Sequence, residues 1–113
     1  MPFNNVAITD KEIQMTIPAT GWKNKVGTSD RGCKCGTWKD HWIKFSKKSW
    51  PASCSVKNCS TTPTLGAHVI NPDVTGERIV PMCDSCNKLS GTFTLKGEVS
   101  VPRANKSETC EKV

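Results

Sequence analysis

The clearest periodic pattern of apolar residues lies in TWKDHWIKFSKK, residues 37–48. Its aromatic residues recur at intervals of one, three and four positions, so they share one face of a helix, and the charged side chains occupy the remaining surface. The aromatic residues are Trp38, His41, Trp42 and Phe45. Thr37, followed three residues later by Asp40, resembles a capping box, so we predict an amphipathic helix over about 38–47. The aromatic face either packs against the rest of the domain, which we favour, or forms a platform for stacking exposed bases.

Further along the chain, apolar runs separated by turn residues predict strands. We expect a strand over 65–70, a turn over 71–76 and a returning strand over 78–80 that ends at Pro81. A short helix is expected to begin at Cys86, run through Leu89 and stop at Gly91.

The C-terminal part alternates apolar and polar positions from 93 to 101, which predicts a β-hairpin with one apolar face. Residues 103–113 are polar and are expected to form a flexible tail. Before the amphipathic helix, 5–17 fits either a short helix or a strand, and 21–32 is expected to be an irregular loop in which Trp22 alone reaches the core.

Two close cysteine pairs, Cys54/Cys59 and Cys83/Cys86, flank the predicted strands. The chain between them is short enough to fold back and bring four thiolates around one ion, and Zn²⁺ favours four such ligands in a tetrahedron. Two disulfides or scattered buried thiols are the alternatives. Close pairs in a chain without a secretory signal favour metal, so we predict a structural zinc at the centre of residues 54–91.

A second set of candidate metal ligands consists of Cys33, Cys35 and His41, with Cys110 as a fourth candidate or a stray thiol. The C-x-C spacing is tight for two ligands of one tetrahedral ion. A single histidine on an apolar helix face is also more often a hydrogen-bonded core residue than a ligand.

The length of 113 residues predicts one domain, and seven cysteines, four tryptophans and no tyrosine suggest a modest core that a bound metal would stabilise. An odd number of cysteines excludes complete internal pairing as disulfides. With no apolar run long enough to cross a bilayer and no signal-like N-terminus, we expect a cytoplasmic protein without a membrane partner.

The positive charge is concentrated in one part of the chain. Residues 31–59 carry seven basic side chains against Asp40, a net +6, while the other 84 residues carry nine basic and nine acidic ones. We call residues 31–57 the basic segment and expect it to bind nucleic acid, DNA in the first place, unless it only keeps the protein soluble. Its candidate contacts are Arg31, Lys34, Lys39, Lys44, Lys47, Lys48 and Lys57; Arg78 is either a further phosphate contact or a solvated charge at a strand end.

The succession of C-x4-C, GAHV and RIVPMCDSCN, about a third of the chain, resembles the zinc-stapled branch of the HNH (His-Asn-His) endonucleases. This resemblance implies a treble-clef, ββα-metal fold in which a first-strand histidine acts as general base. In that family an acidic residue or histidine just before it, together with the last His or Asn, holds a divalent catalytic metal, and a middle asparagine orients the base.

Only part of this motif carries over. His68 matches the general base and Asn87 the final metal ligand, which would hold Mg²⁺ or Mn²⁺. Ala67 stands where the other ligand is expected and cannot coordinate a metal, and Arg78 stands about where the middle asparagine falls, although Asn71 or Asp73 could substitute in space. His68 could instead contact phosphate, pack in the hairpin or replace a cysteine as a zinc ligand.

The expected fold is therefore α+β: a small zinc-stabilised treble clef, preceded by an amphipathic helix and followed by a C-terminal β-hairpin. The expected function is an HNH-like module that binds nucleic acid without full nuclease activity. The alternatives are an active metal-dependent endonuclease with His68 as base, and a zinc-stabilised protein-interaction module. Glycine-rich phosphate loops, nucleophile elbows and paired catalytic carboxylates near the histidines are absent from the sequence, and CDSC at 83–86 lacks the context of a redox motif.

Overall fold

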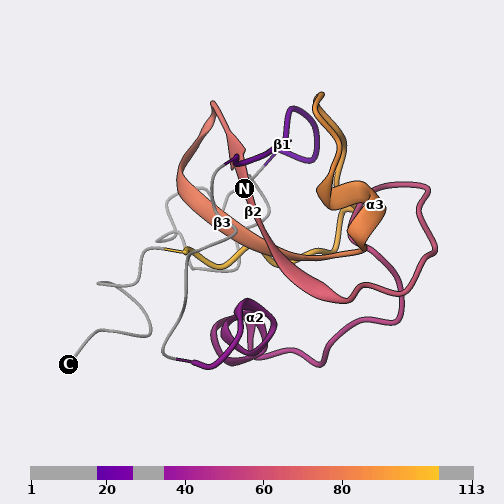
Figure 1. Cartoon of the computed structure of the whole chain (residues 1–113). Helices are drawn as coiled ribbons and strands as arrows, with labels where there is room; N and C mark the ends of the chain where they lie inside the picture. The colour runs from indigo at the N-terminus through magenta and orange to yellow at the C-terminus, as the bar shows by residue number, and fades with distance from the viewer. Residues whose placement is uncertain (1–17, 27–34, 105–113) are drawn as a thin grey trace, which may run out of the picture.

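The computed structural model describes residues 18–26 and 35–104, which form a small α+β fold (Figure 1). Its antiparallel sheet has the strand order β1-β2-β3, and α2 lies across one face of the β2–β3 hairpin. The elements are β1 (Lys23–Asn24), α2 (Trp38–Ser46), β2 (Leu65–Asn71), β3 (Val74–Met82) and α3 (Asp84–Asn87). None of the described helices combines the length and apolar character needed to span a membrane.

The predicted amphipathic helix is confirmed as α2. The Thr37 side chain accepts a hydrogen bond from the Asp40 N–H (3.0 Å), and the helix ends where Lys47 adopts a left-handed conformation at φ 60°. His41 and Trp42 are buried, and the Trp42 indole N–H donates to the Ser100 carbonyl (3.0 Å). The aromatic face therefore packs against the domain, as we favoured, and Trp42 is no stacking platform.

The β2–β3 hairpin also confirms two of the predicted strands, but it is longer than expected. The turn is only Pro72-Asp73, held by the Asp73 N–H donating to Asn71 Oδ1 (2.9 Å), so β3 begins at Val74. The prediction that Pro81 ends the strand is wrong. The Pro81 carbonyl accepts from the Ser55 N–H (3.0 Å) on the side away from β2, so the proline nitrogen also faces that side and removes no β2–β3 hydrogen bond.

Alternating side chains divide the hairpin between two cores. On one face, Ala67 and Val69 of β2 and Val80 and Met82 of β3 join the larger core, which also contains Cys54, Cys83 and Trp22. On the other face, Ile79 packs with Trp42 of α2. The two faces therefore have separate roles: one supports the cysteines and the other carries α2.

Four further predictions are corrected. The predicted C-terminal hairpin, in which 93–95 would pair with 99–101, is wrong. Phe93 bridges to Trp22 and Leu95 to Val56, because their apolar side chains complete the larger core. The predicted loop around Trp22 contains β1, although the burial of Trp22 is confirmed.

The helix α3 begins at Asp84, with Cys83 as its N-cap, and ends at Asn87, so it lies two residues earlier than predicted. The expected flexible tail is wrong for its first two residues, since Arg103 bridges to Arg78 of β3 and Ala104 is buried beside α2. The rest of that tail and the predicted element over 5–17 lie outside the described residues.

Candidate metal centre

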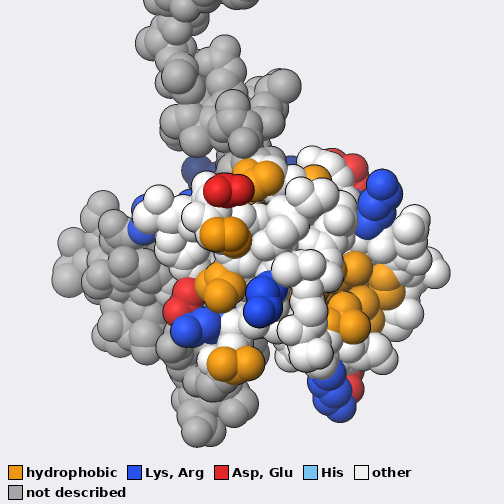
Figure 2. Space-filling view, turned by 90° about the horizontal axis from the view of Figure 1, so that it is seen from above, with side chains coloured by type: hydrophobic (Ala, Val, Ile, Leu, Met, Phe, Trp, Pro, Cys, Tyr) orange, Lys and Arg blue, Asp and Glu red, His pale blue; other side chains and the backbone are white. Residues whose placement is uncertain are grey.

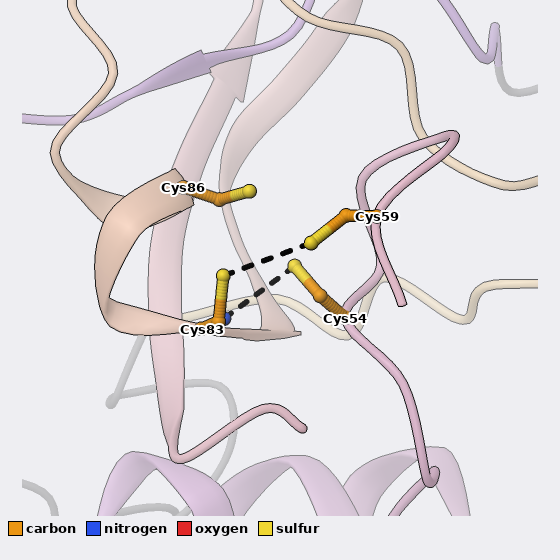
Figure 3. A group of neighbouring side chains, drawn as sticks. All are labelled: Cys54, Cys59, Cys83 and Cys86. Atoms are coloured by element: carbon orange, nitrogen blue, oxygen red, sulfur yellow. Dashed lines mark hydrogen bonds between the residues drawn. The ribbon is translucent and has the colours of Figure 1, made fainter. Parts of the chain in front are cut away.

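Four cysteines meet at the end of the hairpin that lies opposite its turn (Figure 3). Cys54 and Cys59 come from the loop that follows α2, Cys83 is the N-cap of α3, and Cys86 lies within α3. Their sulfur atoms all lie within 4.8 Å of one another, and Cys54 and Cys83 are buried. This cluster could hold a metal ion.

The sulfur separations discriminate between a metal site and disulfides. Four thiolates about 2.3 Å from a tetrahedral Zn²⁺ would be about 3.8 Å apart. The Cys59 and Cys83 sulfurs are 3.8 Å apart, whereas a disulfide requires about 2.05 Å, and all four cysteines are unpaired. The geometry matches the edge of a metal tetrahedron.

A tight turn presents the first pair, and we call residues 54–59 the cysteine turn. The Cys59 N–H donates to the Val56 carbonyl (3.0 Å), and Asn58 provides the left-handed conformation that the turn needs, at φ 71°. Lys96 fixes the turn from outside, because its Nζ donates to the Cys59 carbonyl (2.8 Å) and to Ser53 Oγ (3.0 Å).

The second pair is held by α3 and by β1. The Cys83 N–H points at Cys54 Sγ (3.4 Å), so a backbone amide from one pair faces a thiol of the other. The Asn24 side chain donates to the Cys86 carbonyl (2.9 Å) and to the Leu89 carbonyl (3.0 Å), which anchors the C-terminal end of α3. No pattern in the sequence indicates Asn24 or Lys96 as positioning residues, since both act across more than 35 positions of the chain.

The thiols have different acidities in the metal-free site. Hydrogen bonding from the Thr61 backbone lowers the pKa of Cys59 to about 7. Burial raises the pKa values of Cys54 and Cys86, because it removes water from their thiolates. A bound cation would compensate for this loss of hydration and hold the cluster deprotonated.

Of the second candidate set, the structure brings Cys35 and His41 together, with 4.0 Å between Cys35 Sγ and His41 Nδ1. Cys33 and Cys110 lie outside the described residues.

His68 lies apart from the cysteine cluster. Its side chain points from β2 toward α2, where its ring meets Trp38 edge-on at 4.4 Å between centroids, and it is only 5% exposed. Ala67 points the other way, into the core that contains Cys54 and Cys83. The interpretation that His68 packs in the hairpin is confirmed, and it is not a member of the four-cysteine group. Asn87 is the last residue of α3 and is half-buried.

The candidate phosphate contacts differ in their exposure. Lys39, Lys44, Lys47, Lys48 and Lys57 are exposed, while Arg31 and Lys34 lie outside the described residues. Arg78 is not a solvated charge: its Nη1 donates to the Val101 carbonyl (3.0 Å), and its Nε and Nη2 donate to the Thr75 carbonyl (3.2 and 3.0 Å). In Figure 2 the basic side chains occupy several separate places on the visible face, interspersed with apolar ones, and no histidine is visible there.

Comparison of the chain with protein-family models, curated proteins and solved structures found no match.

Proposed function

We propose that the protein is a zinc-stabilised, HNH-like treble-clef module that binds nucleic acid through its basic segment. The observation that carries the zinc assignment is the convergence of four sulfur atoms within 4.8 Å of one another, with 3.8 Å between those of Cys59 and Cys83. The four residues are Cys54, Cys59, Cys83 and Cys86. The order of elements supports the treble clef, since a cysteine turn, the β2–β3 hairpin and α3 follow one another along the chain.

The zinc has a structural role in this proposal. Four protein thiolates fill the tetrahedron and leave no open position for a substrate or water, as in structural rather than catalytic zinc sites. The ion would join the loop before the hairpin to the helix after it, beside the larger core that contains Cys54 and Cys83.

The exposed lysines support the nucleic-acid partner. In the part of the chain that the structure describes, Lys39, Lys44, Lys47, Lys48 and Lys57 form no ion pair with a carboxylate, whereas Lys88, the C-cap of α3, pairs with Asp84 (2.9 Å). Uncompensated ammonium groups attract phosphates and release counterions when they bind them. Lys57 lies within the cysteine turn, so the metal centre would position one of these charges directly.

The burial of His68 favours binding without hydrolysis. A general base must come within about 3 Å of the water that it activates, or reach it through one further water. Trp38 covers His68, and Ala67 supplies no metal ligand. Nicking of DNA that depends on Mg²⁺ or Mn²⁺ and is lost in His68→Ala would contradict this part of the proposal.

Fluorescence anisotropy with labelled duplex and single-stranded DNA, at several salt concentrations and with zinc present, tests the binding. We expect the affinity to fall steeply with salt, and the double variant Lys44→Glu/Lys47→Glu to bind at least about tenfold more weakly, with a log–log salt slope reduced by about 2.

The matched control is Lys23→Glu/Lys88→Glu, which changes two exposed lysines outside the basic segment. Each pair of reversals lowers the net charge by 4, from +6 to +2, so total charge is the same in both variants. If both double variants bind DNA equally weakly, overall charge and not the basic segment determines the binding. No binding of the unaltered protein to either DNA at low salt would refute the nucleic-acid partner and leave the protein-interaction module.

A further inference from the structure

A thiol and an imidazole face each other at the start of α2, away from the four-cysteine cluster. Cys35 lies three residues before the helix, and His41 lies in it, with Cys35 Sγ 4.0 Å from His41 Nδ1. The His41 side chain is fully buried, while Cys35 is half-buried. Neither Cys35 nor His41 belongs to the four-cysteine site or to the exposed lysines that are proposed to bind nucleic acid.

The hydrogen bond of His41 Nε2 determines which ring nitrogen carries the proton. His41 Nε2 lies 2.8 Å from the Arg103 carbonyl oxygen. A carbonyl only accepts hydrogen bonds, so Nε2 carries the proton and donates it there. Nδ1 of the neutral ring then presents its lone pair toward the Cys35 sulfur.

Two aromatic neighbours fix the plane of this ring. The Trp38 and Phe45 ring centroids each lie 4.8 Å from that of His41, one helical turn before it and one after it. Together with the hydrogen bond to Arg103, these contacts hold the Nδ1 lone pair in one direction before any ligand binds.

These features match a histidine that binds a metal. Such a histidine commonly donates its other ring N–H to a carbonyl or carboxylate, which sets its tautomer and orientation. With Zn–S of about 2.3 Å and Zn–N of about 2.0–2.1 Å at a tetrahedral angle, sulfur and nitrogen would be about 3.6 Å apart. The observed separation is within half an ångström of that value.

We propose that Cys35 Sγ and His41 Nδ1 are ligands of a second metal ion, a thiophilic divalent ion of which Zn²⁺ is the first choice. A nucleophilic cysteine with a histidine base would use the same two atoms but would also need a substrate cleft beside the sulfur. The cavity of about 280 Å³ near Trp42 is lined by other residues, and Cys35 does not border it.

The assignment rests on Cys35 and His41 alone. Among the described residues, the four-cysteine cluster is the one group of three or more side chains that could hold a metal. Cys33 and Cys110, the further candidates from the sequence, lie outside those residues, and the experiment does not depend on them.

The test uses the full chain, purified under reducing conditions with zinc as the probe, and combines metal content with zinc X-ray absorption. We expect two zinc ions per chain, with imidazole scattering beside the dominant sulfur scattering. In His41→Gln the metal content falls to one zinc and the imidazole signal disappears. The chain has two histidines, so the matched control is His68→Gln, which keeps both.

Cys35→Ser provides a second variant that does not disturb a buried side chain. We expect it to hold one zinc, bound by sulfur alone, while the four central cysteines remain protected from alkylation. One zinc per chain in the unaltered protein, with sulfur scattering only, would overturn the second site. So would two zinc ions in both Cys35→Ser and His41→Gln. Either result leaves the four-cysteine centre intact, so the two assignments fail separately.

Discussion

The packing of α2 on the hairpin depends on the missing side chain of Gly66. A Cβ atom built at this position lies 2.5 Å from the Trp38 carbonyl carbon, 2.6 Å from its oxygen and 2.9 Å from the Lys39 nitrogen. All three are backbone atoms, so no rotamer change relieves the contact. Carbon atoms in ordinary contact are about 3.5–4.0 Å apart, so in Gly66→Ala the helix must move away by about 1 Å.

That movement separates α2 from the second core, where Trp42 and Ile79 are buried. Forcing one methyl group into a well-packed interface typically costs about 1–3 kcal/mol, and we expect about 3 kcal/mol here because the obstacle is backbone. Tryptophan fluorescence during urea unfolding, at fixed free zinc, measures the loss as a midpoint lower by roughly 2 M. The zinc content of the four-cysteine centre should not change, since those cysteines support the opposite face of the sheet.

Gly91→Ala is the matched control, because a Cβ there meets nothing within 4 Å and neither glycine has a positive φ. We expect its stability to equal that of the unaltered protein or to exceed it by less than about 1 kcal/mol. Unfolding of Gly66→Ala at the same urea concentration as Gly91→Ala would show that the close approach of the α2 backbone to Gly66 does not limit stability.

Two further predictions concern the metal centre. Asn58→Ala puts an alanine at φ 71° in the cysteine turn, and we expect this backbone strain to cost about 1 kcal/mol of the free energy of zinc binding. A chelator competition should therefore show zinc bound about fivefold more weakly by Asn58→Ala, but no more weakly by Asn58→Gly. Equal affinities of all three proteins would show that the turn does not require this conformation. Zinc affinity should also fall as the pH falls, because protons compete with zinc for the thiolates. Below about pH 7 the Cys59 thiol becomes protonated in the metal-free site, so a plot of log affinity against pH should steepen there by one proton. A slope that is unchanged through pH 7 would contradict the lowered pKa of Cys59.

Local patterns predicted the parts of the fold that local physics determines. Helix α2 has both its cap and its 3.6-residue periodicity in consecutive residues, and the two cysteine pairs have a spacing that the chemistry of zinc explains. The core strands were found from their apolar runs, although Pro81 led to a strand that was too short. Whether a proline is tolerated depends on which side its nitrogen faces, and that is set by strand pairing.

The features that were missed depend on contacts between distant parts of the chain. Phe93 and Leu95 alternate like a hairpin strand, but their backbones pair with Trp22 and the cysteine turn. The two residues of β1 carry no apolar pattern and form a strand only because β2 offers an edge. Asn24 and Arg78 anchor carbonyl groups 23 or more residues away, which no spacing in the sequence indicates.

The most direct test of the zinc centre is mass-spectrometric mapping of cysteine alkylation under reducing conditions, before and after chelation. We expect Cys54, Cys59, Cys83 and Cys86 to be protected together in the metal-bound protein and to become reactive together as one zinc is removed. Alkylation of these four cysteines at the same rates with and without the chelator, or their recovery as disulfides, would contradict the zinc centre.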